Sequence, residues 1–422
     1  MPEATMKGNE TAGLLIELGC EELPPKALDR IRDAFFKTVS DGLENNNISF
    51  DPESSRSFST PRRLGLYFDA VAARQPDQDQ ERRGPATRAA FDSEGKPTGA
   101  ALGFARSVGK DVSELETIKS DKGEWLYAKV HQPGKSLSEV IFPVLELAVR
   151  QLPVPKPMRW ADHDFSFVRP VHWLVVMHGE QVLNGHLLGQ QSGNSTRGHR
   201  IHSPGPHSIP SSRDYSEILL RSFVMADHTQ RKEHIRRIVE QAAPDVLIDP
   251  DLLNEVNNLV EWPIAVACAF EEEFLEVPHA ALIASMQDHQ KFFPVRDGSD
   301  PKLVTNRFVG VANVDSTDIS AVREGYERVI RPRLADARFF LEQDQKQTLD
   351  SYLPRLDRVV FQKKIGTIGD KSSRISNLST NISDYISGDS VVACRAARLC
   401  KCDLVTHMVG EFPELQGLMG QQ

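Results

Sequence analysis

Residues 14–25 read LLIELGCEELPP, and this stretch predicts the fold of the N-terminal part of the chain. The apolar run at 14–16, which Leu18 extends past Glu17, is typical of a buried strand. The two prolines end that strand and suit the first turn of a helix, which then places apolar residues at helical spacing as far as Phe35. The opening of the chain is therefore predicted to form a strand, a turn and a helix.

The rest of the first three-quarters continues this mixture. Further strands are predicted around residues 66–71, 125–130, 171–177, 264–270 and 308–314, and helices at 137–152 and after Asp227, which is placed to cap the helix that follows. Residues 74–100 are polar and contain three prolines, so they are expected to form a long connection.

From about Arg331 the pattern becomes helical, with Pro332 placed to begin a helix and further helical segments at 370–386 and 391–409. We therefore predict an α+β fold whose last quarter is all-helical. The expected parts are a strand–helix–strand segment at 1–72, an α+β segment with a linker at 73–157, an α+β region at 158–325 and a helical domain at 326–422.

Composition narrows the class of protein. The 422 residues are 40% apolar and 26% charged, which is ordinary globular usage. No apolar stretch approaches the roughly 20 residues of a membrane span, and the first ten residues lack the apolar core of a secretory signal. The five cysteines follow no disulfide pattern. We expect a soluble, cytoplasmic protein with reduced thiols and no membrane partner.

Signatures of catalysis and metal binding are missing from the sequence. Gly134-Lys135-Ser136 resembles the end of a phosphate-binding loop, but Lys129 stands where that loop needs glycine. Seven of the thirteen histidines lie between His163 and His207 without regular ligand spacing, and Cys400 and Cys402 are too close in sequence for a zinc pair. We predict no catalytic residue, no metal site and no cofactor on this chain.

Charge is unevenly distributed along the chain. The net charge is -9, but residues 240–300 hold thirteen acids and two bases, a net of -11, whereas residues 323–374 hold twelve bases and eight acids, a net of +4. A polyanionic partner responds to the local potential of one face rather than to the total charge. Solvated surfaces on a large protein would give the same pattern.

Arginines beside aromatic residues carry the functional prediction. Arginine pairs with phosphate through two parallel hydrogen bonds and stacks on bases, and aromatic rings stack on unpaired bases. The alternative for each cluster is an internal ion pair or cation–π contact that fixes the structure. The candidate RNA-contacting residues are Arg62, Arg63, Arg83, Arg159, Trp160, Arg169, Arg197, His199, Arg200, Lys291, Arg331, Arg333 and Arg338.

An ordered set of short motifs resembles the beta subunit of bacterial heterotetrameric glycyl-tRNA synthetase. The motifs are collinear from about residue 12 to 420, and they lie at 17–25, 60–64, 83–86, 121–125, 158–160, 167–170, 197–200, 260–263, 289–294, 331–340 and 401–420. The resemblance implies a beta subunit that binds tRNA(Gly) and the alpha subunit, in an assembly of two alpha and two beta chains. The class II active site, with ATP and Mg, would then lie on the alpha subunit.

The resemblance also implies a domain order. A region like the B3/B4 module of phenylalanyl-tRNA synthetase precedes an HD-like helical domain, and body-tail and anticodon-binding domains follow. This sequence stops within the expected HD-like domain, so that domain is expected to be incomplete and the anticodon-binding domain to be missing. Cys402-Asp403 stands where an HD phosphohydrolase has His-Asp, which predicts a non-catalytic HD fold.

Three alternatives remain open at this point. The helical region could be a metal-dependent HD-type phosphohydrolase, or the B3/B4-like part a hydrolytic tRNA-editing module, although fold analogy is a weak warrant for function. The arginine motifs could also serve only a protein–protein interface.

Overall fold

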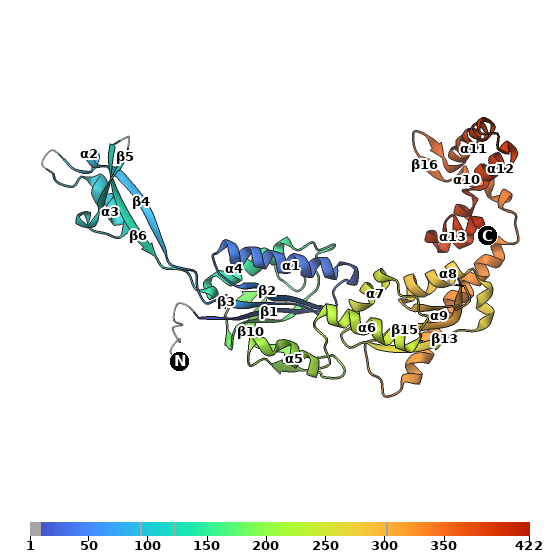
Figure 1. The fold of residues 1–422 in the computed structure, drawn as a ribbon, viewed down its shortest axis with the longest axis horizontal. Coiled ribbons are helices and arrows are strands. Elements are labelled where there is room, and N and C mark those ends of the chain that lie inside the picture. The colour runs from blue at the N-terminus through green and yellow to red at the C-terminus, as the bar shows by residue number, and fades with distance from the viewer. Residues whose placement is uncertain (1–9, 93–94, 121–122, 301–302) are drawn as a thin grey trace. The chain divides into compact units, whose positions relative to one another are not determined.

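A computed structural model describes residues 10–92, 95–120, 123–300 and 303–422 (Figure 1). The chain forms two compact units. Unit 1 comprises the residues up to Gly198 together with Gly205–Arg221, and unit 2 comprises His199–Pro204 and Ser222–Gln422.

Unit 1 is built on a seven-stranded sheet whose order is β2-β3-β1-β7-β10-β9, with β8 paired to β7. Strand β1 is central and pairs antiparallel with β3 and β7, which explains why its side chains from Gly13 onward are buried. The strands are β1 (Thr11–Cys20), β2 (Asp51–Thr60), β3 (Arg63–Ala72), β7 (Val171–His178), β8 (Gln181–Val182), β9 (His186–Leu187) and β10 (Gln190–Gly193). The predicted strand at the start of the chain is confirmed.

Two helices cover one face of this sheet, α1 (Pro25–Asn45) and α4 (Leu137–Gln151), which lie side by side in Figure 1. Helix α1 begins at proline, as predicted, and α4 begins with a reciprocal capping box between Ser136 and Glu139. Their apolar faces and the sheet form the main core of unit 1. Unit 1 also contains the hairpin β11 (Ser195–Arg197) and β12 (Pro206–Ser208), and the helices η2 (Ser212–Asp214) and α5 (Tyr215–Arg221).

Residues 78–132 form a small module of their own. Its sheet has the order β4-β6-β5 and consists of β4 (Gln78–Ala86), β5 (Glu116–Ser120) and β6 (Gly123–Gln132). The helices are α2 (Thr87–Ala90), α3 (Gly99–Val108) and η1 (Val112–Glu114). The expectation that residues 74–100 are only a connection is wrong. Strand β4 went unrecognised because its sequence, QDQERRGPA, contains no large apolar side chain, and no residue of this solvated strand is fully buried.

Unit 2 contains a second sheet of order β13-β15-β14, formed by β13 (Ile264–Ala269), β14 (Phe293–Arg296) and β15 (Val304–Ala312). Two apolar cores involve its strands. One includes α6 (His228–Ala242) and α7 (Pro250–Asn257), and the other includes η3 (Glu272–Glu276), α8 (His279–Ala284) and the π-helical turn η4 (Ser285–His289). Asp227 caps α6 as predicted, because its side chain accepts from the N–H groups of Thr229 and Gln230.

The helical C-terminal region begins earlier than predicted. Helix α9 (Ile319–Asp344) starts at Asp318, which caps it, and runs straight through Pro332. Proline inside a helix removes one backbone hydrogen bond, and here the buried face at Ile330, Leu334 and Ala337 holds the helix together across that gap. The prediction that Pro332 begins a helix is therefore wrong.

The rest of this region is helical except for one hairpin. Its helices are η5 (Leu349–Tyr352), α10 (Leu353–Leu356), α11 (Ile368–Tyr385), α12 (Ser390–Leu399), η6 (Cys402–Val405), α13 (His407–Glu411), η7 (Pro413–Leu415) and α14 (Leu418–Gln421). The hairpin pairs β16 (Val360–Gln362) with β17 (Gly366–Thr367). The prediction that the last quarter of the chain is entirely helical is therefore wrong. Gly366 has φ +91°, which allows the chain to reverse there. Within the described ranges, no helix is both long and apolar enough to cross a membrane.

Candidate nucleic-acid interface

A buried ion pair organises one end of the sheet in unit 1. Arg63, at the start of β3, donates to the Glu17 carboxylate of β1 at 3.0 Å, and both side chains are completely buried. Arg63 also donates to the Thr196 hydroxyl at 3.3 Å and to the carbonyl of Arg197 at 3.0 Å. A buried charge is tolerated only when it is paired and hydrogen-bonded. Arg63 therefore holds β11 against the sheet and is inaccessible to a ligand.

Trp173 of β7 lies beside this pair. The guanidinium carbons of Arg62 and Arg63 lie 5.9 and 5.7 Å from the centre of its ring. The ring packs flat on Gly19, where a Cβ atom would lie 1.7 Å from a ring carbon. Only glycine permits this approach, so the strand pairing of Gly19 with Trp173 fixes where the indole lies.

Three arginines with side chains not fully buried gather at this end, and we call Arg62, Arg169 and Arg197 the sheet-edge arginines. Arg169 donates to the carbonyls of Glu22 and Val168 at 3.1 and 3.2 Å. Burial raises the pKa of the Cys20 thiol, while the nearby charges of Arg62, Arg63 and Arg169 oppose that rise. Backbone contacts place the other two arginines at the same end, because the Cys20 N–H donates to the carbonyl of Arg62 at 2.8 Å and Arg63 donates to the carbonyl of Arg197.

Arg83 and Trp125 form a second contact of this kind on the β4–β6 module. The guanidinium carbon of Arg83 lies 3.6 Å from the centre of the Trp125 ring. Arg83 is exposed on β4, whereas Trp125 is partly buried on the paired strand β6. The stacked guanidinium keeps its outer face open to solvent.

Arg159 and Trp160 stabilise their own loop. Arg159 donates to the carbonyl of His163 at 2.9 Å and to the Asp164 carboxylate at 3.0 Å. Trp160 packs edge-on against Phe165, 5.2 Å between ring centres, and against the main core. These contacts match the structural alternative raised for each arginine cluster.

In unit 2, His199 and Lys291 are also engaged internally. His199 is buried, its Nδ1 accepts from the N–H groups of Ile201 and His202 at 3.2 Å, and burial lowers its pKa. Lys291 forms an ion pair with Glu255 at 3.0 Å. Arg200, by contrast, has an exposed side chain. The neutral imidazole of His199 thus supports the chain segment that presents Arg200.

The three arginines predicted on α9 meet acidic side chains. Arg331 lies 2.7 Å from Glu271, and Arg333 lies 3.5 Å from Glu411. Arg338 contacts three carboxylates, those of Glu273, Glu276 and Glu342, at 2.9, 3.7 and 3.2 Å. The acidic segment at 271–276 therefore neutralises much of this basic helix. Sequence could not reveal the pairing, because the partners lie about sixty residues apart, as with Arg331 and Glu271.

The Cys402-Asp403 doublet is buried in unit 2. Asp403 accepts a hydrogen bond from the N–H of Gly417, and burial raises the pKa of the Cys402 thiol to about 11. In the part of the chain that the structure describes, no group of three or more His, Cys, Asp or Glu side chains could hold a metal ion. His407 instead bonds through Nδ1 to Asp344 of α9 at 2.8 Å.

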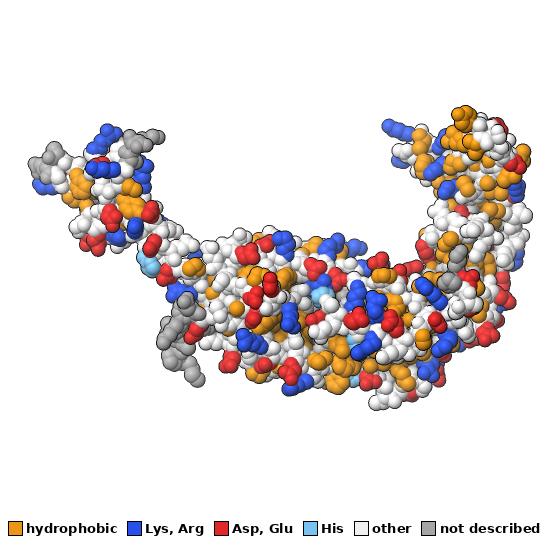
Figure 2. Space-filling model, viewed as in Figure 1, with side chains coloured by type: hydrophobic (Ala, Val, Ile, Leu, Met, Phe, Trp, Pro, Cys, Tyr) orange, Lys and Arg blue, Asp and Glu red, His pale blue; other side chains and the backbone are white. Residues whose placement is uncertain are grey.

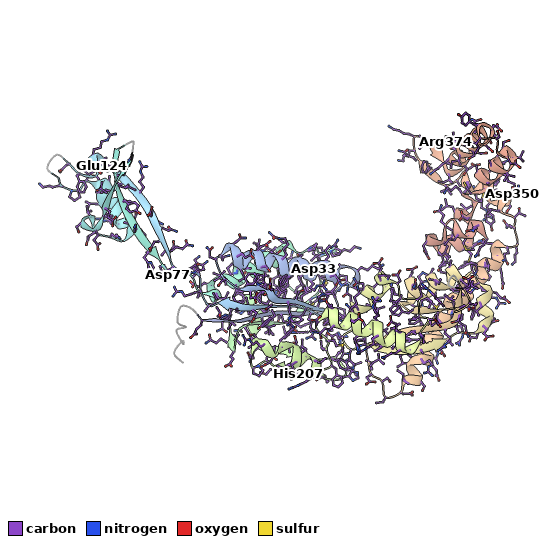
Figure 3. All side chains as sticks on the ribbon, viewed as in Figure 1. Asp33, Asp77, Glu124, His207, Asp350 and Arg374 are labelled. Atoms are coloured by element: carbon purple, nitrogen blue, oxygen red, sulfur yellow. The ribbon has the colours of Figure 1, made fainter. Side chains whose placement is uncertain are left out.

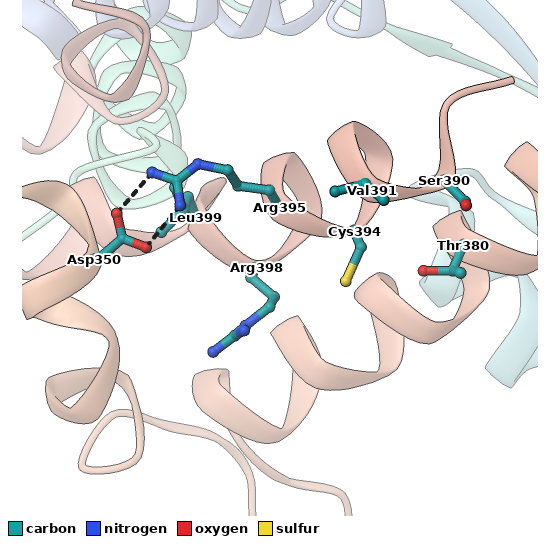
Figure 4. A pocket seen from close by; sticks show the side chains of 8 residues that line it. All are labelled: Asp350, Thr380, Ser390, Val391, Cys394, Arg395, Arg398 and Leu399. Carbon is teal, nitrogen blue, oxygen red and sulfur yellow. Dashed lines mark hydrogen bonds and ion pairs between the residues drawn. The ribbon is translucent and has the colours of Figure 1, made fainter.

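A shallow pocket of about 420 Å³ lies between α11 and α12 (Figure 4). Arg395 holds Asp350 through two hydrogen bonds of 2.9 and 3.2 Å at one side of it. Cys394 lies across from Thr380, and hydrogen bonds from Ser376 and Thr380 lower the pKa of its thiol. The pocket presents a half-exposed thiol and one further cation, Arg398.

Sequence analysis missed a second basic surface, which we call the hairpin patch. It consists of exposed or half-exposed cations on the β16–β17 hairpin and its flanks, namely Arg358, Lys363, Lys364, Lys371 and Arg374. The sequence indicates this surface only through the net charge of +4 over residues 323–374. That net charge does not show which of the cations are paired with carboxylates.

Comparison with known proteins identifies the family. The family model described as glycyl-tRNA synthetase beta subunit matches residues 14–422, and this chain belongs to that family. The glycine–tRNA ligase beta subunit of Alteromonas mediterranea is 46% identical over 415 residues, and that of Pseudoalteromonas translucida is 45% identical over 411 residues. These alignments cover 97% and 96% of this chain and 59% of each relative, so the chain spans about three-fifths of their length.

The relatives bear on the alternatives raised from sequence. These two relatives and the 45% identical protein of Marinobacter nauticus, which is matched over 60% of its length, are named as beta subunits of glycine–tRNA ligase. A metal-dependent phosphohydrolase is not supported by these findings. The candidate RNA-contacting residues and the editing alternative remain predictions.

Proposed function

We propose that this chain acts as the beta subunit of a glycyl-tRNA synthetase, which binds tRNA(Gly) and an alpha subunit and so supports ATP-dependent glycylation of the tRNA. The match to the beta-subunit family along residues 14–422 is the observation that carries the proposal. ATP and Mg act at the alpha subunit, two alpha and two beta chains assemble, and the enzyme works in the cytoplasm. Residues 158–325 form a B3/B4-like region, and residues 326–422 belong to an HD-like domain.

Within this function, the sheet-edge arginines are the favoured RNA contacts of unit 1. Arg169 and Arg197 are exposed, half-buried Arg62 lies beside the fixed indole of Trp173, and none of the three has a carboxylate partner among the described residues. Cations that are held in place but not neutralised are suited to phosphate. Arg63, which is fully buried, supports this surface from within unit 1 rather than touching RNA.

The experiment is a titration of the purified chain with tRNA(Gly) transcript at several salt concentrations, alone and with the alpha subunit, followed by a glycylation assay. A phosphate-driven complex loses affinity steeply as salt rises. We expect salt-dependent binding and glycylation that requires both chains. The proposal would be overturned if the alpha subunit charged tRNA equally well without this chain and if the two chains together bound no tRNA.

A further inference from the structure

The β16–β17 hairpin presents a basic and aromatic surface. Val360 and Phe361 on β16 are 69% and 42% exposed, although such residues usually pack inward. Lys363 and Lys364 lie exposed in the turn that follows. Figure 2 shows Lys and Arg side chains around this hairpin, and Figure 3 labels Arg374 on the neighbouring helix α11.

The charge of this segment is only partly compensated locally, by an electrostatic interaction between Asp370 and Arg374. Residues 353–374 contain six Lys or Arg and two Asp, a net of +4. One of the two acids, Asp370, is committed to capping α11, where it accepts from the N–H and the hydroxyl of Thr367 at 2.8 and 3.0 Å. The segment therefore carries excess positive charge on a short, exposed stretch of chain.

The cations of the hairpin patch differ from those of α9. Among the described residues, no carboxylate oxygen lies within 4.0 Å of the side-chain nitrogens of Arg358, Lys363, Lys364, Lys371 or Arg374. Arg331, Arg333 and Arg338 on α9, by contrast, each have at least one such partner. Pairing removes the attraction of a cation for phosphate, so the hairpin patch retains what the α9 arginines have lost.

One contact on the hairpin also suits nucleic acid. The ammonium group of Lys371 lies 4.0 Å from the centre of the Phe361 ring, so a cation and an exposed aromatic face share one site. Surfaces that bind RNA strands combine such rings with positive charge along the backbone path. A protein partner is better suited to the opposite end of α11, where Tyr385, Ile386 and Val391 expose apolar side chains.

We infer that the hairpin patch is a phosphate-contacting surface for an RNA ligand. The inference rests on the proposed tRNA-binding function and adds a site that lies outside the motifs singled out from sequence. Lys363 and Lys364 contact the RNA backbone, and the Phe361–Lys371 pair provides a face for stacking.

The test compares two double variants of the full chain, each of which removes two positive charges. Lys363→Ala/Lys364→Ala alters the patch, and Lys37→Ala/Lys156→Ala alters exposed lysines of unit 1 as the matched control. Binding of tRNA(Gly) transcript is measured against salt. Each lost phosphate contact lowers the slope of log affinity against log salt by roughly 0.7–0.9. We expect the patch variant to show a slope shallower by about 1.5 and several-fold weaker binding, and the control to match wild type.

The remaining outcomes separate the two levels of the proposal. The inference is overturned if the patch variant binds tRNA with the affinity and salt slope of wild type and if Lys363→Glu/Lys364→Glu also leaves binding intact. The proposed function would still stand in that case. If the wild-type chain binds no tRNA, alone or with the alpha subunit, both the inference and the proposed function are overturned. A patch variant that keeps tRNA but no longer binds the alpha subunit assigns the hairpin to a protein interface and overturns the inference.

Discussion

The Arg63 guanidinium donates to the Glu17 carboxylate at 3.0 Å, and neither side chain has any exposed surface. The pair joins two neighbouring strands, β1 and β3, at the end where the sheet-edge arginines gather. Replacing Arg63 by alanine leaves the buried Glu17 charge without its partner. We expect the free energy of unfolding to fall by about 3–5 kcal/mol in urea titrations.

The control is the double variant Glu17→Leu/Arg63→Met, which removes both charges. It is expected to recover much of the lost stability, because apolar side chains of similar volume often replace a buried ion pair at little cost. A loss below about 1 kcal/mol for Arg63→Ala would show that the pair does not hold this end of the sheet together.

Arg169 and Arg197 are expected to matter for RNA binding and little for stability, since both side chains are exposed. Arg169→Ala/Arg197→Ala should weaken tRNA(Gly) binding several-fold and reduce its salt dependence. The matched control is Arg331→Ala/Arg333→Ala, which removes two arginines that already pair with Glu271 and Glu411. Equal losses of affinity in the two variants would contradict the distinction between paired and unpaired arginines.

Asp344 predicts a pH-dependent contribution to stability. Burial opposes ionisation, yet hydrogen bonds from the N–H groups of Met408 and His407 prevail and hold its pKa below the ordinary 3.8. A carboxylate with a lowered pKa stabilises the fold fully above its unfolded-state pKa and loses that contribution as the pH falls through its folded-state pKa. Asp344→Asn should therefore unfold more easily than wild type at pH 7, and the difference should shrink below about pH 4.

Thermal unfolding at several pH values checks this expectation. Asp336→Asn, at an exposed position of the same helix, serves as the control. A difference between Asp344→Asn and wild type that stays constant down to pH 3 would mean that the carboxylate does not carry the effect.

The cysteines should differ in reactivity. Cys394 is half-exposed, and hydrogen bonds from Ser376 and Thr380 lower its pKa. Burial raises the pKa of Cys268 to about 12 and that of Cys402 to about 11. Because the thiolate is the reactive form, iodoacetamide at neutral pH should modify Cys394 long before these two, as followed by peptide mass spectrometry. Ser376→Ala should slow the reaction at Cys394, and an unchanged rate would contradict this explanation.

Sequence patterns correctly predicted those helices and strands whose formation depends on residues close together in the sequence. The apolar run of β1 and the cap at Asp227 were both recognisable, because each depends on neighbours in sequence. Strand β4 lacks the alternation of a half-buried strand, and α9 continues through a residue that normally ends helices. In both cases tertiary surroundings decide the structure, and a single sequence does not contain them in readable form.

The candidate RNA-contacting residues show the same dependence on tertiary structure. An arginine beside an aromatic residue is visible in sequence, but whether its charge is free depends on distant carboxylates. Glu17 neutralises Arg63 from 46 residues away, and Glu273 neutralises Arg338 from 65 residues away. The lysines of the hairpin patch have no aromatic residue directly beside them in sequence, and Lys371 reaches Phe361 only once the hairpin has folded back.

The bond between Thr196 and Glu17, 2.9 Å long, closes a loop of 179 residues. During synthesis on the ribosome, β1 therefore emerges long before the strand that completes the surroundings of its acidic side chain. Closing so long a loop is slow, because its entropy must be lost before any native contact compensates for it. The arginine-bearing edge of unit 1 is thus a late product of folding, and a nascent chain acquires it only after β11 has left the exit tunnel.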